Sequence, residues 1–202
     1  MAFKERLTIL LEPEIKDLYS IPTLSVEQKR VFFALNDPEL ACISSIRDRN
    51  QKCLAIALLG YFKVKPILLN TRFNEVQPDL KFIATEYFPK FNITRFSANR
   101  MQKARLYQKV LDVLGFKNWS SDYENSLQIH LQSIAKSSIE PRYFFDASIE
   151  YLAHNKIAIP KYTVLQRIIS KTINTEKIRL LSILKDAVST ELSYALNKLI
   201  TG

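Results

Sequence analysis

Apolar residues recur at helical spacing along most of the chain, and the alternation typical of a strand is nowhere sustained. Only three glycines occur, and most of the eight prolines lie at the apparent starts or ends of helices. The sequence therefore predicts an all-α protein. We expect helices over residues 12–19, 26–35, 37–47, 53–62, 78–87 and 97–115, from 121, over 141–155, from 162 and after Ser189.

One stretch interrupts this helical pattern. Residues 67–77 have no clean apolar period, and a proline stands on either side of them, at Pro66 and Pro78. We therefore expect a helical subdomain over 1–66, a linker over 67–77 and a second helical subdomain over 78–202.

Positive charge is concentrated in parts of the chain. The 29 Lys and Arg against 20 Asp and Glu leave a net charge of +9. Between Tyr87 and Leu111 there are six cations and no acid, namely Lys90, Arg95, Arg100, Lys103, Arg105 and Lys109. A local field of this sign attracts nucleic acid or anionic lipid.

The predicted helix from Tyr162 has a polar face without an acid. Its apolar side is an ordinary core stripe, Val164, Leu165, Ile168, Ile169 and Ile173. Its other side is Gln166, Arg167, Ser170, Lys171 and Asn174, and no Glu follows until Glu176. With the helix over 141–154, this arrangement is typical of a helix-turn-helix whose second helix lies in the major groove. A merely solvated face is the alternative.

The DNA interpretation as a whole has a condition. Arg167 and Lys171 must be neither buried under packed side chains nor neutralised by carboxylates of neighbouring segments, because a paired cation is not available to a phosphate.

A second cationic cluster precedes the helix over 53–62. Arg47, Arg49, Asn50 and Lys52 near a helix N-terminus would form a phosphate clamp, since free N–H groups and cations point the same way. Asp48 supports an alternative of equal weight, in which it pairs with an arginine and holds the turn.

Catalytic and metal-binding patterns are missing from the sequence. Cys42 and Cys53 lie in apolar helical patterns and are expected to be buried thiols. His130 and His154 have no partner spacing and are expected to be partly buried structural residues. There is no GxGxxG, P-loop or GxSxG motif. We expect no catalysis, no signal peptide and no membrane span, and hence a soluble, cytoplasmic protein.

Four separated motifs carry a family resemblance. They are "DLYSIPTLS", "FFALNDPELACISSIRDRNQKCLAIALLGYFK", "LYQKVLDVLGFKNWS" and "ASIEYLAHNKIAIPKYTVLQRIISK". In this order, from about Leu10 to Lys185, the chain resembles the N-terminal region of transposases of the Tn-three family, the large replicative transposons. The resemblance implies helix-turn-helix-like DNA-binding subdomains on a CENP-B-like plan, which bind the terminal inverted repeats of the transposon.

The resemblance also implies that DNA binding and catalysis belong to different domains. Strand transfer in such transposases belongs to a later RNase H-like domain with three metal-binding acids, so no cofactor is expected in this chain and a divalent metal only in that domain. The expected partner is double-stranded DNA, with no small molecule and no membrane. The fragment is expected to be monomeric, the full transposase dimeric, and the protein bacterial and nucleoid-associated.

Candidate DNA-binding residues follow from the resemblance and from the charge pattern. The resemblance implies contacts from Arg47, Arg49, Asn50, Lys52, Lys161, Thr163, Gln166 and Arg167. The polar face adds Tyr162, Ser170 and Lys171, and the basic stretch adds Arg100, Lys103 and Arg105. In that stretch relatives carry a Thr-Arg-x-x-His run, where this chain has Gln102 and Leu106 at the approximate Thr and His places.

A different function class stays open beside this one. The aromatic segments "RVFF" and "RYFFDASIEYL" would suit a helical protein-interaction module without nucleic-acid function. A basic amphipathic helix lying on an anionic membrane is a third interpretation, which fits poorly because a compact helical protein needs its apolar stripes for the core.

Overall fold

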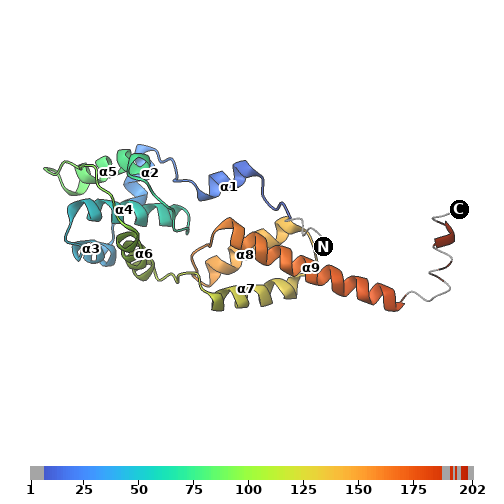
Figure 1. The fold of residues 1–202 in the computed structure, drawn as a ribbon. Coiled ribbons are helices and arrows are strands. Elements are labelled where there is room, and N and C mark those ends of the chain that lie inside the picture. Colours follow the sequence, from blue (N-terminus) through green and yellow to red (C-terminus); the bar gives the residue numbers. More distant parts are fainter. Residues whose placement is uncertain (1–6, 188–191, 193, 195–196, 200–202) are drawn as a thin grey trace. The chain divides into compact units, whose positions relative to one another are not determined.

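The computed structural model describes residues 7–187, 192, 194 and 197–199 of the 202-residue chain, and these residues are predominantly helical (Figure 1). The all-α prediction is confirmed. The helices are α1 (Glu12–Tyr19), α2 (Val26–Phe32), α3 (Asp37–Ser44), α4 (Arg49–Val64), α5 (Phe73–Tyr87), α6 (Arg100–Leu114), α7 (Ser121–Ile134), α8 (Pro141–His154) and α9 (Tyr162–Ala187). The start of the predicted helix after Ser189 lies outside the described residues.

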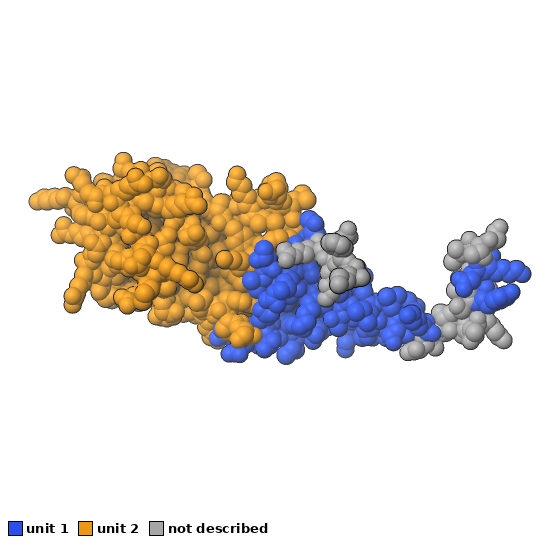
Figure 2. Space-filling model, viewed as in Figure 1, with its two compact units in different colours: residues 1–9, 122–148, 163–202 blue, residues 10–121, 149–162 orange. Residues whose placement is uncertain are grey.

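The chain forms two compact units, coloured separately in Figure 2. Unit 1 comprises residues 1–9, 122–148 and 163–202, and unit 2 comprises 10–121 and 149–162. The predicted linker, 67–77, lies inside unit 2. Its apolar residues Ile67 and Leu69 are buried in that unit's core, which is why the compact units do not divide the chain where the sequence pattern is interrupted.

Helix α4 is the centre of unit 2. All ten of its residues from Cys53 to Phe62 are buried, and α2, α3, α5 and α6 each contact it. A helix that is apolar on every side needs neighbours all round. The helix starts at Arg49, four residues before the predicted start, because Asp48 accepts a hydrogen bond from the backbone N–H of Gln51 at 2.8 Å and caps it.

Helix α5 also begins earlier than predicted. Pro78 was expected to open it, but the helix starts at Phe73 and Pro78 lies within it. Glu75 accepts a hydrogen bond from the backbone N–H of Arg72 at 2.9 Å, which closes the first turn ahead of the proline. The early start brings Val76, which is 1% exposed, into the core.

A buried polar cluster ties α2, α4 and α5 together. Tyr61 on α4 donates a hydrogen bond to Asp79 on α5 at 2.5 Å, and Lys29 on α2 forms an ion pair with the same carboxylate at 2.8 Å. Burial, and then the bond to Asp79, raise the pKa of Tyr61. The hydroxyl therefore stays protonated and keeps its donor role.

The link between α8 and α9 is extended and buried. Ile157, Ala158, Ile159 and Pro160 are all buried, and the segment forms isolated bridges through Ile157 with Lys117 and through Ile159 with Ile67. The backbone N–H of Ile159 donates to the carbonyl of Pro66 at 2.9 Å. This link differs from the turn of three or four residues that joins the helices of a helix-turn-helix.

Unit 1 is built on the apolar stripe of α9. Leu165, Ile168, Ile169 and Ile173 are at most 1% exposed, as the sequence predicts. They share the unit with Leu127 and Leu131 of α7 and Phe144 of α8, all fully buried. Farther along α9 apolar residues remain, but Ile178, Leu181 and Leu184 are 56–68% exposed.

The first prediction concerns the packing of Gly60 in α4. A Cβ at this position would lie 2.2 Å from Cδ1 of Phe33, a ring that is itself 1% exposed. We expect Gly60→Ala to lower the free energy of unfolding by about 1–3 kcal/mol through overpacking, measured by chemical denaturation. Phe33→Leu in the Gly60→Ala background should relieve part of this overpacking. A Gly60→Ala variant as stable as the unaltered chain would contradict the close approach.

Candidate nucleic-acid interface

The turn before α4 presents two exposed arginines. Arg47 and Arg49 are exposed, and neither forms an ion pair with a carboxylate of the described residues. Asp48 between them pairs with no arginine within that part of the chain, since its carboxylate caps α4 at the N–H of Gln51. The turn is therefore held by a cap, and the arginines are left for an external anion.

The other two residues of this cluster are less accessible. Asn50 and Lys52 are half-buried, and Oδ1 of Asn50 is buried without a hydrogen-bond partner. An oxygen enclosed in this way cannot reach a base edge. Within the predicted clamp, Arg47 and Arg49 are thus the side chains best placed for a phosphate.

Helix α6 has an exposed face that carries no acid along its first two turns. Leu106, Val110 and Leu111 are buried, while the opposite face consists of Arg100, Met101, Ala104, Arg105 and Gln108, all exposed. Asn99 caps the helix by accepting a hydrogen bond from the N–H of Gln102 at 2.9 Å. Only at Asp112 does an acid follow, and Gln108 donates a hydrogen bond to it at 2.7 Å.

The lysines of α6 fasten it to its neighbours. Lys103 donates to the carbonyl of Thr71 at 2.6 Å, and Lys109 donates to the hydroxyl of Ser45 at 2.9 Å. These contacts involve no carboxylate, so both amino groups keep their positive charge uncompensated. Lys103 is half-buried and is shared between an anchoring bond and the surface.

Two regions that are separate in the sequence adjoin in unit 2. Ser45, just before Arg47, contacts Lys109 of α6, and the guanidinium carbon of Arg49 lies 5.9 Å from the ring centroid of Phe91 in the connection between α5 and α6. The cations of this surface are Arg47, Arg49, Lys90, Arg95, Arg100, Lys103, Arg105 and Lys109. None of them is paired with a carboxylate in the described part of the chain. We call this set the basic surface.

The polar face of α9 differs from the basic surface, because one of its cations is paired with a carboxylate. Arg167 donates two hydrogen bonds to Glu124 of α7, at 2.8 and 2.7 Å, in a bidentate ion pair. The hydrogen bonds from Arg167 lower the pKa of the Glu124 carboxyl, and the pKa of Arg167 is raised. The expectation of a face without an acid is wrong for Arg167, because α7 supplies the carboxylate that α9 lacks.

Other candidates on α9 are likewise engaged within their own unit. Lys171 donates to the side-chain oxygen of Gln128 on α7 at 3.2 Å, and Gln166 donates to the carbonyl of Leu7 at 2.9 Å. Oγ of Ser170 is buried without a partner. The hydrogen bonds join α9 to α7 and to the N-terminal segment of unit 1, so this face serves first as a packing surface.

The candidate residues at the start of α9 differ in exposure. Tyr162 is half-buried, and its hydroxyl accepts a hydrogen bond from the N–H of Leu10 at 3.3 Å. Lys161 and Thr163 are exposed. Of the candidates at and along α9, these two are exposed and have neither a side-chain hydrogen bond nor an ion pair within the described part of the chain.

Metal and membrane chemistry find no site in the described residues. No group of three or more His, Cys, Asp or Glu side chains there could hold a metal ion. Cys53 is buried as predicted, whereas Cys42 is half-buried. His130 is half-buried, but His154 is exposed rather than partly buried, because it ends α8. Nor does any described helix combine the length and apolarity needed to span a bilayer.

Part of the basic surface was not predicted to bind DNA, although the charge pattern of the sequence includes it. Lys90, Arg95 and Lys109 belong to the acid-free run but were not among the candidate DNA-binding residues, and neither was Gln108. The helical spacing of Arg100, Ala104 and Gln108 was the available signal, since residues four apart lie on one face.

Comparison with known proteins gives one family match. Residues 9–172 match the family described as a domain of unknown function (DUF4158). No curated protein matches the chain.

The second prediction tests the ion pair of Glu124 with Arg167. A lowered carboxyl pKa means that the pair stabilises the fold above about pH 4.5, the ordinary value, and that this contribution is lost as the pH falls through the lowered pKa. We expect Glu124→Gln to reduce stability by at most about 1 kcal/mol at neutral pH and to match the unaltered chain in acid. Thermal unfolding over a pH series measures this, with Glu140→Gln as the control. A difference between the two proteins that grows toward acid would refute the pairing.

Proposed function

This chain belongs to the DUF4158 family, and we propose that it is the DNA-binding part of a Tn-three family transposase, which binds the terminal inverted repeats of its transposon. The family match over residues 9–172 spans nearly the same stretch as the motif resemblance, from about Leu10 to Lys185. Domains of this family are found in Tn-three family transposases, which supports the assignment.

The basic surface of unit 2 is the observation that carries the proposal. Surface cations in globular proteins are commonly interspersed with acids, and here eight cations form no ion pair with a carboxylate of the described residues. The phosphate backbone of DNA is the partner that releases counterions on binding such a surface. Arg47 and Arg49 are assigned to phosphates, because they flank a capped helix N-terminus.

Helix α6 is the element proposed to meet the base edges. Its exposed face combines Arg100 and Arg105 with Gln108, and arginine and glutamine are side chains that bind purine edges in the major groove. A helix packed by one side on α4 and α3 is held rigidly enough to present the other side. Helix α9, in contrast, is proposed to have mainly a structural role in unit 1, with Lys161 and Thr163 as its remaining candidate contacts.

The proposal separates binding from chemistry. Strand cleavage and transfer, with their divalent metal, are assigned to another domain of the transposase, and this chain is assigned no cofactor. Its proposed partner is double-stranded DNA at the transposon ends.

The alternative, a protein-interaction module, depended on the aromatic segments "RVFF" and "RYFFDASIEYL". Phe33, Phe144 and Phe145 in these segments are at most 5% exposed, so their rings are part of the core. Exposed apolar side chains occur in the same segments, at Val31 and Tyr143, and on α9, at Ile178, Leu181 and Leu184. Association through these residues would depend little on salt, which separates the two functions experimentally.

The third prediction is a salt dependence. If about five phosphates are neutralised, the logarithm of the binding constant for duplex DNA should fall with the logarithm of salt concentration at a slope of about −4 to −5. Fluorescence anisotropy with a labelled terminal-repeat duplex measures the slope. A slope near zero would remove the DNA proposal and favour the apolar alternative.

The fourth prediction concerns Arg105. We expect Arg105→Ala to weaken binding to the terminal repeat by about 1–3 kcal/mol, and to weaken binding to a scrambled duplex less, if the side chain reaches a base. Arg30→Ala removes an exposed arginine of unit 2 outside the basic surface and should leave both affinities unchanged. Equal losses on the two duplexes would reduce Arg105 to a phosphate contact.

A gel shift compares the same two duplexes with the unaltered chain. No preference for the inverted repeat over the scrambled sequence would contradict the sequence-specific part of the proposal. Arg167→Ala serves as a further comparison, because an arginine engaged with Glu124 should affect DNA binding less than Arg105 does.

A further inference from the structure

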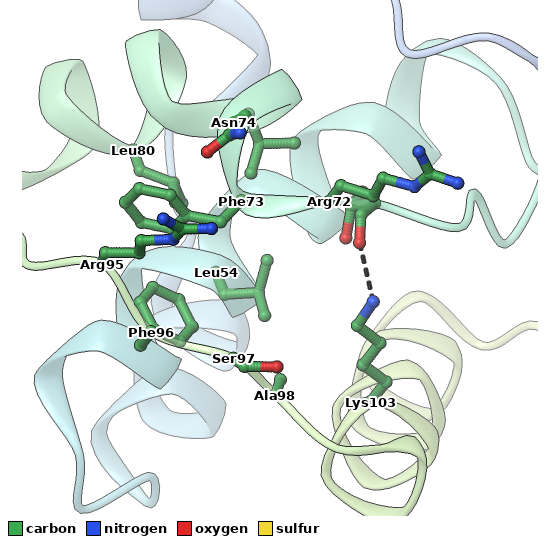
Figure 3. A pocket seen from close by; sticks show the side chains of 12 residues that line it. Leu54, Arg72, Phe73, Asn74, Leu80, Arg95, Phe96, Ser97, Ala98 and Lys103 are labelled. Atoms are coloured by element: carbon green, nitrogen blue, oxygen red, sulfur yellow. Dashed lines mark hydrogen bonds between the residues drawn. The ribbon is translucent and has the colours of Figure 1, made fainter.

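A pocket opens in unit 2 beside the basic surface. It has a volume of about 320 Å³ and lies between the start of α5, the segment 95–98 and Lys103 of α6 (Figure 3). Phe73, Arg95 and Phe96 stand on one side of it and Lys103 on the other, with Leu54 of α4 between them (Figure 3). Its volume falls at the lower end of the range for small-ligand pockets.

The lining combines aromatic faces with positive charge. The rings of Phe73 and Phe96 meet edge to face, with centroids 5.5 Å apart, and both are half-buried, so part of each ring is open to a ligand. Arg95 is exposed, and none of the twelve lining residues is an acid. Asn74 and Ser97 add neutral hydrogen-bonding groups. A ligand that satisfies this lining is flat, apolar on its faces and flanked by negative charge on both sides.

We propose that this pocket holds the base of one unpaired nucleotide of the bound DNA, with the two phosphates that flank this nucleotide in the strand on Arg95 and on Lys103. The inference rests on the proposed function and goes beyond it, because a paired base is stacked inside the duplex and cannot enter a pocket. An unpaired base stacks on aromatic rings with little regard to sequence. The proposed ligand is therefore a nucleotide that is extruded, bulged or frayed.

The position of the pocket favours a strand over a free nucleotide. Lys103 and Ala98 also line a second hollow, together with Arg100 and Tyr107 of α6. A DNA strand lying along the exposed start of α6 thus passes the mouth of the first pocket. Lys103 is held at this junction by its bond to the carbonyl of Thr71, which places its charge at the mouth of the pocket before any ligand binds.

The test compares two duplexes with the full chain. One carries a single unpaired fluorescent purine analogue, and the other carries the same analogue paired. We expect about tenfold tighter binding to the first duplex, which is the effect of one base stacking on an aromatic ring, and a change in the emission of the analogue as it leaves the stacked bases of the duplex. Phe96→Ala should abolish the preference while leaving affinity for the paired duplex within about twofold.

A matched control and a competitor complete the experiment. Phe88→Ala removes another half-buried phenylalanine, which ends α5 outside the pocket, and should keep the preference. Deoxyadenosine monophosphate in about hundredfold excess should not displace the unpaired duplex, and displacement would assign the pocket to free nucleotides and overturn the proposal. The emission measurement needs no variant, so a folding defect in Phe96→Ala does not decide the outcome.

The results separate the two proposals. Equal affinity of the unaltered chain for both duplexes, with unchanged emission, would overturn the pocket assignment and leave duplex binding intact. Retention of the preference in Phe96→Ala would overturn it as well. Absence of binding to either duplex would overturn both the pocket assignment and the function on which it rests.

Discussion

The burial of α4 on every side is the constraint on which the rest of unit 2 depends. A helix with ten consecutive buried residues packs against four neighbours, and this packing fixes which side of each neighbour is buried and which side faces outward. The charged N-terminal turn of α4 is left at the surface, beside α6 and the connection that precedes it. The packing of one apolar helix thus gathers cations from residues 47–109 onto adjoining elements.

The cations of the two units differ in the groups that they contact. In unit 1 the cations of α9 meet Glu124 and Gln128 of α7, and the contacts stabilise a helix pair. In unit 2 the cations of α6 meet carbonyl and hydroxyl oxygens, which hold the side chains without cancelling their charge. Only the second arrangement leaves a net positive field for an external polyanion, and for this reason the proposed interface is centred on α6 rather than on α9.

The pocket extends the same argument from charge to shape. The early start of α5 at Phe73 places an aromatic ring against Phe96, and Lys103 reaches from α6 to the carbonyl of Thr71 on the far side. Three segments therefore create a small hollow at the edge of a cationic surface. In the proposed function, the basic surface binds duplex DNA and the pocket binds one unpaired nucleotide of that DNA.

The sequence by itself determined most helices and several caps, because hydrogen bonds between residues three or four apart fix them: Ser25, Asn36 and the start of α9 lie where the pattern predicts. Helices α4 and α5 are the exceptions, since they begin four and five residues before their predicted starts. Apolar spacing likewise identified the buried side of α9. Only the tertiary structure decided which polar face stays unpaired, since Arg167 and Glu124 are 43 residues apart and helical spacing carries no information on which helix packs opposite. The pocket and the burial of residues 67–69 depend on the same long-range packing.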